Sequence, residues 1–153
     1  MNSRESNTDI VLNVMNALEV NDQEVVESYL AEAFTFSGWT PQPLGKPGFL
    51  SLITHLKEGI PGLIFNLHNI LEEDETMLTG TLRISGYQSQ SFSLQDIGLP
   101  DVALQGRSIA LPSEDVTYRF EQDQLVAFAI EPVPGSGLAG LLHQLGVDLP
   151  VIQ

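Results

Sequence analysis

The sequence predicts a single α+β domain in which a curved antiparallel sheet and N-terminal helices enclose an apolar pocket. Its 153 residues are the usual size of one domain with one core. Apolar residues recur at helical spacing in the first third of the chain, and strand-like segments dominate the remaining two thirds. No repeat or linker divides the chain, so we predict one domain over residues 1–153, with its core at about 8–150.

Two helices are predicted at the start of the chain. From Thr8 or Asp9, apolar residues recur three and four positions apart as far as Leu18, and this spacing predicts an amphipathic helix that ends near Asn21. Asp22 then precedes a second segment of the same period, which includes Leu30 and Ala33. The short connection between them predicts that the two helices pack as a hairpin.

A short strand and a third helix come next. Residues 34–38 alternate with period two, and residues 39–48 contain the prolines and glycines of a loop. Pro47 fits the first turn of a helix. The apolar stripe of that helix comes after it at helical spacing and stops before the Gly-Ile-Pro-Gly segment at 59–62; its members are Phe49, Leu52, Ile53 and Leu56.

The long strands of the sheet are predicted in two hairpins. Segments 63–72 and 76–87 flank an acidic turn, and segments 107–120 and 124–133 flank a second polar turn. Residues 89–105 show no clear period. Leucines at helical spacing then predict a short closing helix that ends before Gly146; they are Leu138, Leu141, Leu142 and Leu145.

Charge and composition exclude several classes of partner. Six basic against twenty acidic residues give a net charge of −14, which repels nucleic acid and anionic membrane surfaces. The chain has no cysteine, so disulfides and thiolate metal sites are excluded. The start lacks the apolar stretch of a secretory signal, and no segment approaches the ~18–20 apolar residues of a membrane span. We expect a cytoplasmic protein.

Four short segments, taken in order, resemble a known family. They are Pro43-Leu-Gly-Lys-Pro-Gly-Phe49, Gly98-Leu-Pro100 with Gly106-Arg107, Tyr118-Arg-Phe-Glu-Gln-Asp-Gln-Leu-Val126, and Leu141-Leu-His-Gln-Leu-Gly146 with Leu149-Pro150. Together they resemble the SnoaL-like polyketide cyclase family, within the nuclear transport factor 2-like superfamily, over about residues 8–150. The resemblance implies a cone-shaped sheet over a cavity, a small apolar or aromatic ligand, a homodimer, and no cofactor.

The family's catalytic motif is altered in this chain. Cyclases of this kind carry a histidine-tryptophan-aspartate motif on the last strand, where the acidic residue is a general acid/base. The corresponding position holds Phe128-Ala129-Ile130, and none of these side chains can transfer a proton. Glu131 is one position further on, and the alternation of a strand predicts that it points to the opposite face.

Three residues are candidates for acid/base catalysis: His68, Glu131 and Asp115. His68 shares strand parity with Asn66 at a separation of about 6–7 Å, so one is a candidate base and the other a candidate oxyanion donor. The alternative is that both lie on a solvated face of the sheet or at a subunit contact. Glu131 and Asp115 lie near the last strands, where an apolar cavity would raise the pKa of either carboxyl; a surface location is the alternative.

The candidate ligand-binding residues combine aromatic surface with a few polar groups. The alternative for these residues is simple packing in the core, and for His55 it is a position on the rim of the cavity. The acidic segment 72–75 is interpreted as a solvated turn, and His55 with Glu58 lacks a third ligand, so no metal site is predicted. The predicted ligand-binding residues are Trp39, His55, Asn66, Tyr87, Tyr118, Phe128 and Ile130.

Three functions remain open from the sequence. The first is a protein that binds a small apolar or aromatic molecule in its cone after losing or relocating the family's acid/base residue. The second is an active cyclase, isomerase or hydrolase that uses Glu131, Asp115 or His68. The third is an interaction module whose sheet forms a homodimer or docks a protein partner.

Overall fold

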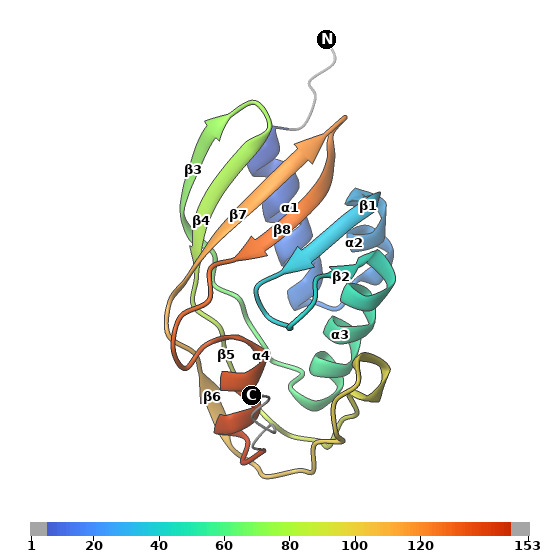
Figure 1. Ribbon diagram of the computed structural model, residues 1–153, viewed down its shortest axis with the longest axis vertical. Helices are drawn as coiled ribbons and strands as arrows, with labels where there is room; N and C mark the ends of the chain where they lie inside the picture. The colour runs from blue at the N-terminus through green and yellow to red at the C-terminus, as the bar shows by residue number, and fades with distance from the viewer. Residues whose placement is uncertain (1–5, 148–153) are drawn as a thin grey trace.

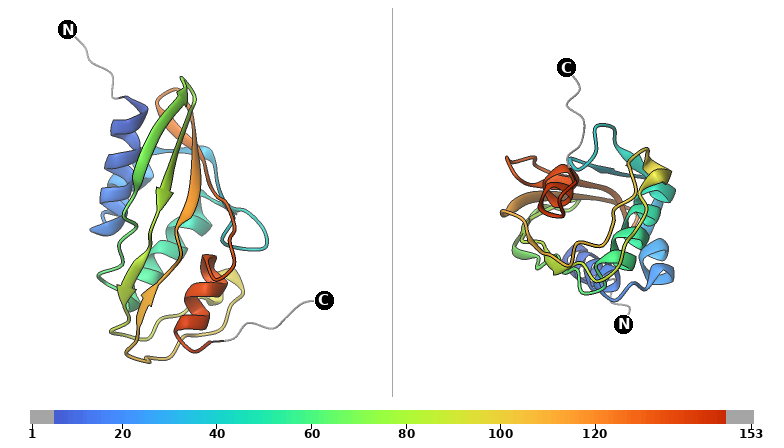
Figure 2. Two further views of the ribbon diagram at one scale, coloured as in Figure 1. Left: turned by 90° about the vertical axis from the view of Figure 1, so that its left-hand side faces the viewer. Right: turned by 90° about the horizontal axis from the view of Figure 1, so that it is seen from below.

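The computed structural model describes residues 6–147, in which a strongly curved sheet wraps around helices to form a cone (Figures 1 and 2). The helices are α1 (Asn7–Glu19), α2 (Gln23–Tyr29), α3 (Lys46–Gly59) and α4 (Gly137–Gln144), with the 3-10 turn η1 (Gln95–Ile97). The main strands are β1 (Leu30–Ser37), β2 (Leu44–Gly45), β3 (His68–Asp74), β4 (Met77–Leu82), β7 (Glu114–Glu121) and β8 (Gln124–Ile130). A small ribbon of β5 (Ser85–Tyr87) and β6 (Ser108–Ala110) continues from the sheet towards the opposite end of the cone.

The main sheet has the strand order β2-β1-β8-β7-β4-β3. Its neighbours are antiparallel except β1 and β8, which pair in parallel with Phe36 opposite Phe128. The sheet is therefore antiparallel, as predicted, apart from this one parallel pair. Alternation of apolar and polar residues has the same period in both kinds of pairing, and no hairpin fixes the relative direction of two strands so far apart in sequence.

The helices begin where capping residues allow it. The Ser6 hydroxyl accepts a hydrogen bond from the Asp9 amide at 3.1 Å, and the Asp22 carboxylate accepts one from the Val25 amide. Pro47 lies in the first turn of α3. The buried faces of α1 and α3 cover the concave side of the sheet, with α1 behind β4, β7 and β8 (Figure 1). No helix among residues 6–147 is long and apolar enough to span a bilayer.

Two predicted elements have different limits in the structure. The second helix ends at Tyr29, and Leu30 and Ala33 lie in β1, because pairing with β8 draws this segment into an extended strand. The predicted strand over 63–67 is irregular: the Phe65 amide donates to the Glu19 carboxylate at 2.9 Å, and the Leu63 carbonyl accepts from Lys57. Side chains thus take backbone hydrogen bonds that a regular ladder would use.

Each of the next two predicted strands is broken into two. Segment 76–87 divides into β4 and β5, and segment 107–120 divides into β6 and β7. Pro112 lies in the second break and has no N–H for the ladder. The breaks allow the β5–β6 ribbon to turn away from the main sheet and line the end of the cone beside α4 (Figure 1). Leu149 and Pro150, which belong to the last family-like segment, lie outside the described residues.

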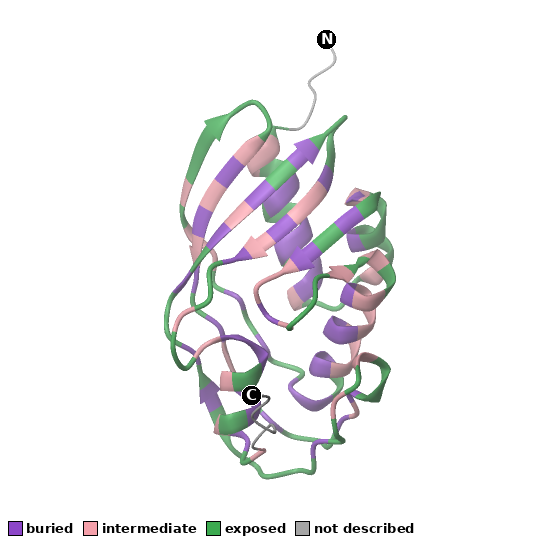
Figure 3. Cartoon of the chain, in the orientation of Figure 1, coloured by how far each residue is buried: buried purple, intermediate pink, exposed green. Residues whose placement is uncertain are grey.

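Aromatic rings fill the upper interior of the cone. Phe36 packs against Phe128 and Phe49 with centroid distances of 5.1 and 4.9 Å, and Tyr118 packs against Phe128 at 4.8 Å. Buried and less buried residues alternate along β7, as Figure 3 shows. The inward face of this strand thus belongs to the core.

A glycine at the end of β1 sets how closely that strand approaches β8. Gly38 has a φ of +101°, and a Cβ at this position would lie 1.9 Å from the Ile130 carbonyl oxygen. We predict that Gly38→Ala lowers the free energy of unfolding by at least about 2 kcal/mol, because backbone strain and a steric clash combine. Urea denaturation followed by circular dichroism measures this change.

Gly62→Ala is the matched control, since no atom lies within 4 Å of a Cβ at that position and its φ is not positive. The prediction is contradicted if the two variants unfold at the same urea concentration.

Candidate functional site

A buried carboxyl and an indole meet inside the cone. Glu114 is the first residue of β7, and Trp39 directly follows Gly38 at the end of β1. The Trp39 indole N–H donates to Glu114 Oε2 at 3.0 Å. Glu114 has no exposed surface, and Trp39 is 6% exposed. Two segments 75 positions apart in sequence therefore form one polar contact in an otherwise apolar interior.

The environment of Glu114 favours its neutral form. Burial raises the pKa of the Glu114 carboxyl above its ordinary value of 4.5, while hydrogen bonding by Trp39, Ser136 and the Gly137 amide acts in the opposite direction. The second oxygen, Oε1, is buried and has no hydrogen-bond partner. A protonated carboxyl here can both donate and accept a hydrogen bond, so Glu114 has unused capacity facing the interior.

Tyr118 is a second buried polar group on the same face of β7. It lies four positions after Glu114 and has no exposed surface. Its hydroxyl has no hydrogen-bond partner, and burial raises its pKa. The two side chains start about 13 Å apart along the strand. The inner face of β7 thus presents two unpaired polar groups, with Val116 between them.

The space around these groups is closely packed. Two hollows on the described surface lie outside the cone. One is an open depression between residues 61–62 and the β5–β6 ribbon, and the other lies between α2 and Lys46. The open interior expected from the sequence is instead occupied by aromatic and aliphatic side chains. A guest molecule must displace some of them.

Four of the predicted ligand-binding residues come together in this interior. Trp39, Tyr118, Phe128 and Ile130 are all buried, and Phe128 contacts the Tyr118 ring. Their positions follow the alternation of β7 and β8. Whether they bind a ligand stays a prediction.

The other predicted residues lie elsewhere. Asn66 is exposed and adopts a φ of +50°, and its backbone carbonyl lies 2.8 Å from His68 Nδ1. Asn66 precedes β3, so the two residues do not share a regular strand as predicted. Tyr87 is 53% exposed and lines the open depression beside the β5–β6 ribbon.

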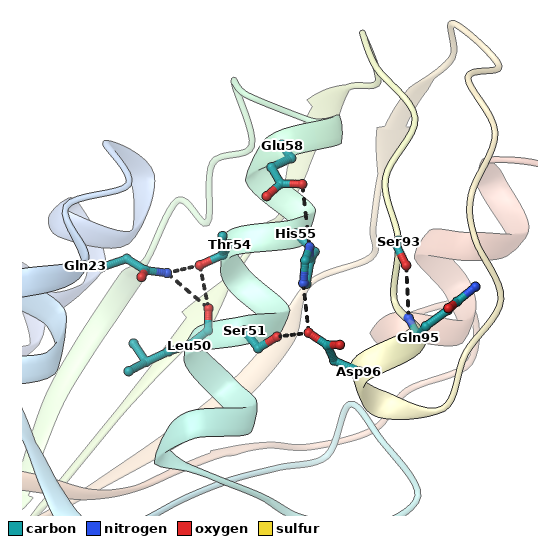
Figure 4. Close-up of polar contacts among 9 residues, drawn as sticks. All are labelled: Gln23, Leu50, Ser51, Thr54, His55, Glu58, Ser93, Gln95 and Asp96. Atoms are coloured by element: carbon teal, nitrogen blue, oxygen red, sulfur yellow. Dashed lines mark hydrogen bonds and ion pairs between the residues drawn. The ribbon is translucent and has the colours of Figure 1, made fainter.

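His55 lies outside the interior in a small polar cluster (Figure 4). Its Nε2 is 3.1 Å from Asp96 Oδ2, and its Nδ1 is 3.6 Å from Glu58. The Ser51 hydroxyl donates to the same Asp96 oxygen at 3.0 Å. The hydrogen bonds from His55 and then Ser51 lower the pKa of Asp96. The cluster joins α3 to η1. Within residues 6–147, no three His, Asp or Glu side chains gather as metal ligands.

The two carboxylates predicted as catalytic are exposed, and the prediction did not include the buried carboxyl of Glu114. Asp115 and Glu131 both lie on the surface, and the Glu131 amide donates to the Asp115 carbonyl at 2.8 Å. Glu131 faces away from the interior, as its parity predicts. A catalytic role for His68, Glu131 or Asp115 stays a prediction. Glu114 shares parity with Val116, Tyr118 and Phe120, and this alternation was the sequence signal that could have found it.

Solved structures show which class of protein has this fold. A SnoaL-like polyketide cyclase from Agrobacterium tumefaciens superposes with a TM-score of 0.63 and 21% identity, over 83% of this chain and 91% of that one. AclR from Streptomyces galilaeus, provisionally described as a hydroxylase, superposes with a TM-score of 0.68 and 15% identity, over 91% of this chain and 94% of that one. A nuclear transport factor 2-like protein of unknown function from Cytophaga hutchinsonii superposes with a TM-score of 0.59 and 17% identity, over 88% of this chain and 96% of that one.

The protein therefore has the same fold as these SnoaL-like and nuclear transport factor 2-like proteins, and the sequence predicted this fold. No protein-family profile matches the chain, and no curated protein sequence matches it. The likeness is one of fold, and the chemistry has to be argued from the side chains of this chain.

Glu114 gives the stability of the protein a specific pH dependence. In the unfolded chain its carboxyl ionises near pH 4.5, whereas in the folded chain it keeps its proton to higher pH. The stability that this group contributes is present below pH 4.5 and is lost as the pH rises through the folded pKa. We predict that the wild type loses stability relative to Glu114→Gln over this range, as measured by urea denaturation at a series of pH values.

Trp39 is the sole tryptophan of the chain, so its fluorescence reports this site directly during the titration. Asp115→Asn is the control, because Asp115 is an exposed neighbour on the opposite face of β7 and its replacement should leave the Trp39–Glu114 contact intact. A wild type and Glu114→Gln variant with parallel pH profiles would contradict the assignment.

Proposed function

We propose that the protein binds a small, largely apolar molecule inside its cone, with a carbonyl or hydroxyl oxygen of that molecule hydrogen-bonded to Glu114. The observation that carries this proposal is the buried Glu114 Oε1 with no partner. Buried polar atoms in proteins are nearly always paired, and leaving one unpaired costs about 1–3 kcal/mol. A guest that supplies the missing partner recovers that free energy.

The surroundings of Glu114 support an apolar guest. Phe36, Phe128 and Ile130 belong to the same interior, and aromatic side chains with few polar groups are typical of small-molecule sites. The net charge of −14 disfavours polyanions such as nucleic acid. The likeness in fold to a polyketide cyclase is compatible with a small organic ligand. A homodimer and a cytoplasmic location stay predictions of the sequence.

Acetophenone and ethylbenzene test this proposal as a matched pair with and without an oxygen. At about pH 4, below the ordinary pKa of the carboxyl, we expect wild type to bind acetophenone about tenfold more tightly than ethylbenzene, because the protonated Glu114 donates to the carbonyl. Glu114→Gln should keep this preference, since its amide also donates, and Glu114→Leu should lose it. Isothermal titration calorimetry measures the affinity of each variant for both probes.

Native mass spectrometry of protein purified from its own host provides an independent test, because a tightly held apolar ligand should survive purification. The proposal fails if both probes bind equally in all variants or if neither binds to wild type.

A second function, acid/base catalysis on a carbonyl compound, is favoured by one specific observation. Burial raises the pKa of Glu114, and a general base works best when its pKa is near the operating pH. In this function the Glu114 carboxylate takes a proton from the carbon next to a carbonyl and later returns a proton. The Tyr118 hydroxyl is a second interior donor without a partner, about 13 Å further along β7.

Exchange of the acetophenone methyl protons in D2O separates binding from catalysis. If Glu114 is a base, wild type accelerates the exchange, and Glu114→Gln binds acetophenone but loses the acceleration. Proton NMR follows the loss of the methyl signal. Equal exchange rates with and without protein would contradict the catalytic function, and binding would then be the only function proposed.

A further inference from the structure

Helix α4 closes one end of the cone. In Figures 1 and 2 it lies beside the β5–β6 ribbon near the lower end of the cone and covers part of that end. Its leucines point into the core with at most 1% exposure; they are Leu138, Leu141, Leu142 and, directly after the helix, Leu145.

The first residues of α4 also cover Glu114. Ser136 precedes the helix and Gly137 begins it, and both lie close enough to the Glu114 carboxyl to oppose the rise in its pKa. Glu114 has no exposed surface in this arrangement. Movement of α4 would therefore uncover the same carboxyl whose second oxygen lacks a partner.

The connection from β8 to α4 contains a glycine-rich hinge. Gly135 and Gly137 have φ values of +82° and +74°, a region that side chains other than glycine rarely adopt. A Cβ on Gly140 would lie 2.2 Å from the Gly135 carbonyl oxygen, so the hinge folds directly against the helix. Ser136 steadies the turn, because its hydroxyl accepts from the Val133 amide and donates to the Val133 carbonyl.

The Gln144 side chain joins the far end of α4 to the β5–β6 ribbon. The Gln144 side-chain amide donates to the Ala110 carbonyl at 2.9 Å and accepts from the Ala110 amide at 2.7 Å. Ala110 is the last residue of β6, and its other neighbour in the ribbon is Ser85 of β5. Gln144 thus takes the place that a neighbouring strand would take, and both of its hydrogen bonds are at the surface.

We propose that α4 is a hinged lid over Glu114, that the glycines at 135 and 137 are its hinge, and that Gln144 is the latch that holds it shut. The lid accounts for a closely packed interior that nevertheless receives a guest: the leucines of α4 leave with the helix, and the guest takes their space. The role in ligand entry rests on the proposed function, whereas the motion of the lid is independent of it.

Thiol labelling tests the motion without any ligand, because the chain has no cysteine of its own. Leu142→Cys places a thiol on the lid, and Leu56→Cys places one on α3; both leucines are fully buried. With 5,5′-dithiobis(2-nitrobenzoate) as the probe, we expect the thiol at 142 to react faster than the thiol at 56. Adding Gln144→Ala should accelerate the reaction at 142 about tenfold or more and leave the reaction at 56 unchanged.

Gln42→Ala, at an exposed glutamine in the loop between β1 and β2, is the matched control and should change neither rate. Equal rates at positions 142 and 56, including no reaction at either, would overturn the lid. Equal acceleration at both positions by Gln144→Ala would also overturn it, because the helix would then open only when the whole chain unfolds.

Amide hydrogen exchange gives the same comparison without a cysteine. The Val147 amide donates to Leu142 on the lid, and the Ile60 amide donates to Leu56 on α3. We expect Gln144→Ala to speed exchange at Val147 and leave Ile60 unchanged, and equal effects would contradict the proposal. If the lid opens but acetophenone does not bind, the proposed function fails alone. If acetophenone binds, Gln144→Ala should raise its association rate by the same factor as the labelling rate.

Discussion

The alternation of side chains along β7 is the constraint on which the interior depends. This strand is hydrogen-bonded to β4 on one side and to β8 on the other, so its register is fixed from both edges. Glu114, Val116, Tyr118 and Phe120 are buried, while Asp115, Arg119 and Glu121 are exposed. A shift of one position would bring Asp115 and Arg119 inside and expose the aromatic residues, which no core of this composition can accept. The carboxyl of Glu114 is therefore carried into the cone by the same register that buries the core.

Two buried ionisable groups in this protein have opposite environments. Lys57 donates to the carbonyls of Glu19, Pro61 and Leu63, at 2.6, 2.5 and 3.3 Å, which uses all three of its N–H groups. Burial lowers its pKa, and the nearby Glu19 opposes that shift. Its bonds join the end of α1 to the turn after α3, which is a structural role. Glu114 has one oxygen held by Trp39 and one without a partner, and this incompleteness distinguishes a candidate site from a structural contact.

The fold by itself does not define the chemistry. A polyketide cyclase and a protein provisionally described as a hydroxylase share it with this chain at 21% and 15% identity. At the position of the cyclases' histidine-tryptophan-aspartate motif, this chain has Phe128, Ala129 and Ile130 on β8. The interior carboxyl comes instead from the neighbouring strand β7, and the indole that holds it comes from the loop after β1. Hydrogen bonding from the start of α4 connects this carboxyl to the element that closes the cone.

The sequence by itself determined the fold class, the order of the helices and strands, and the burial of Trp39, Tyr118, Phe128 and Ile130, because local periodicity and turn residues encode these properties. It also contained the parity that puts Glu114 inside and Asp115 outside, although the sequence prediction favoured Asp115 and Glu131 instead. Only the tertiary structure decided that β1 pairs in parallel with β8, that Trp39 meets Glu114, and that Gln144 binds Ala110. These contacts join segments far apart in the chain, and their distances and partners depend on how the whole sheet curls, which no local pattern specifies.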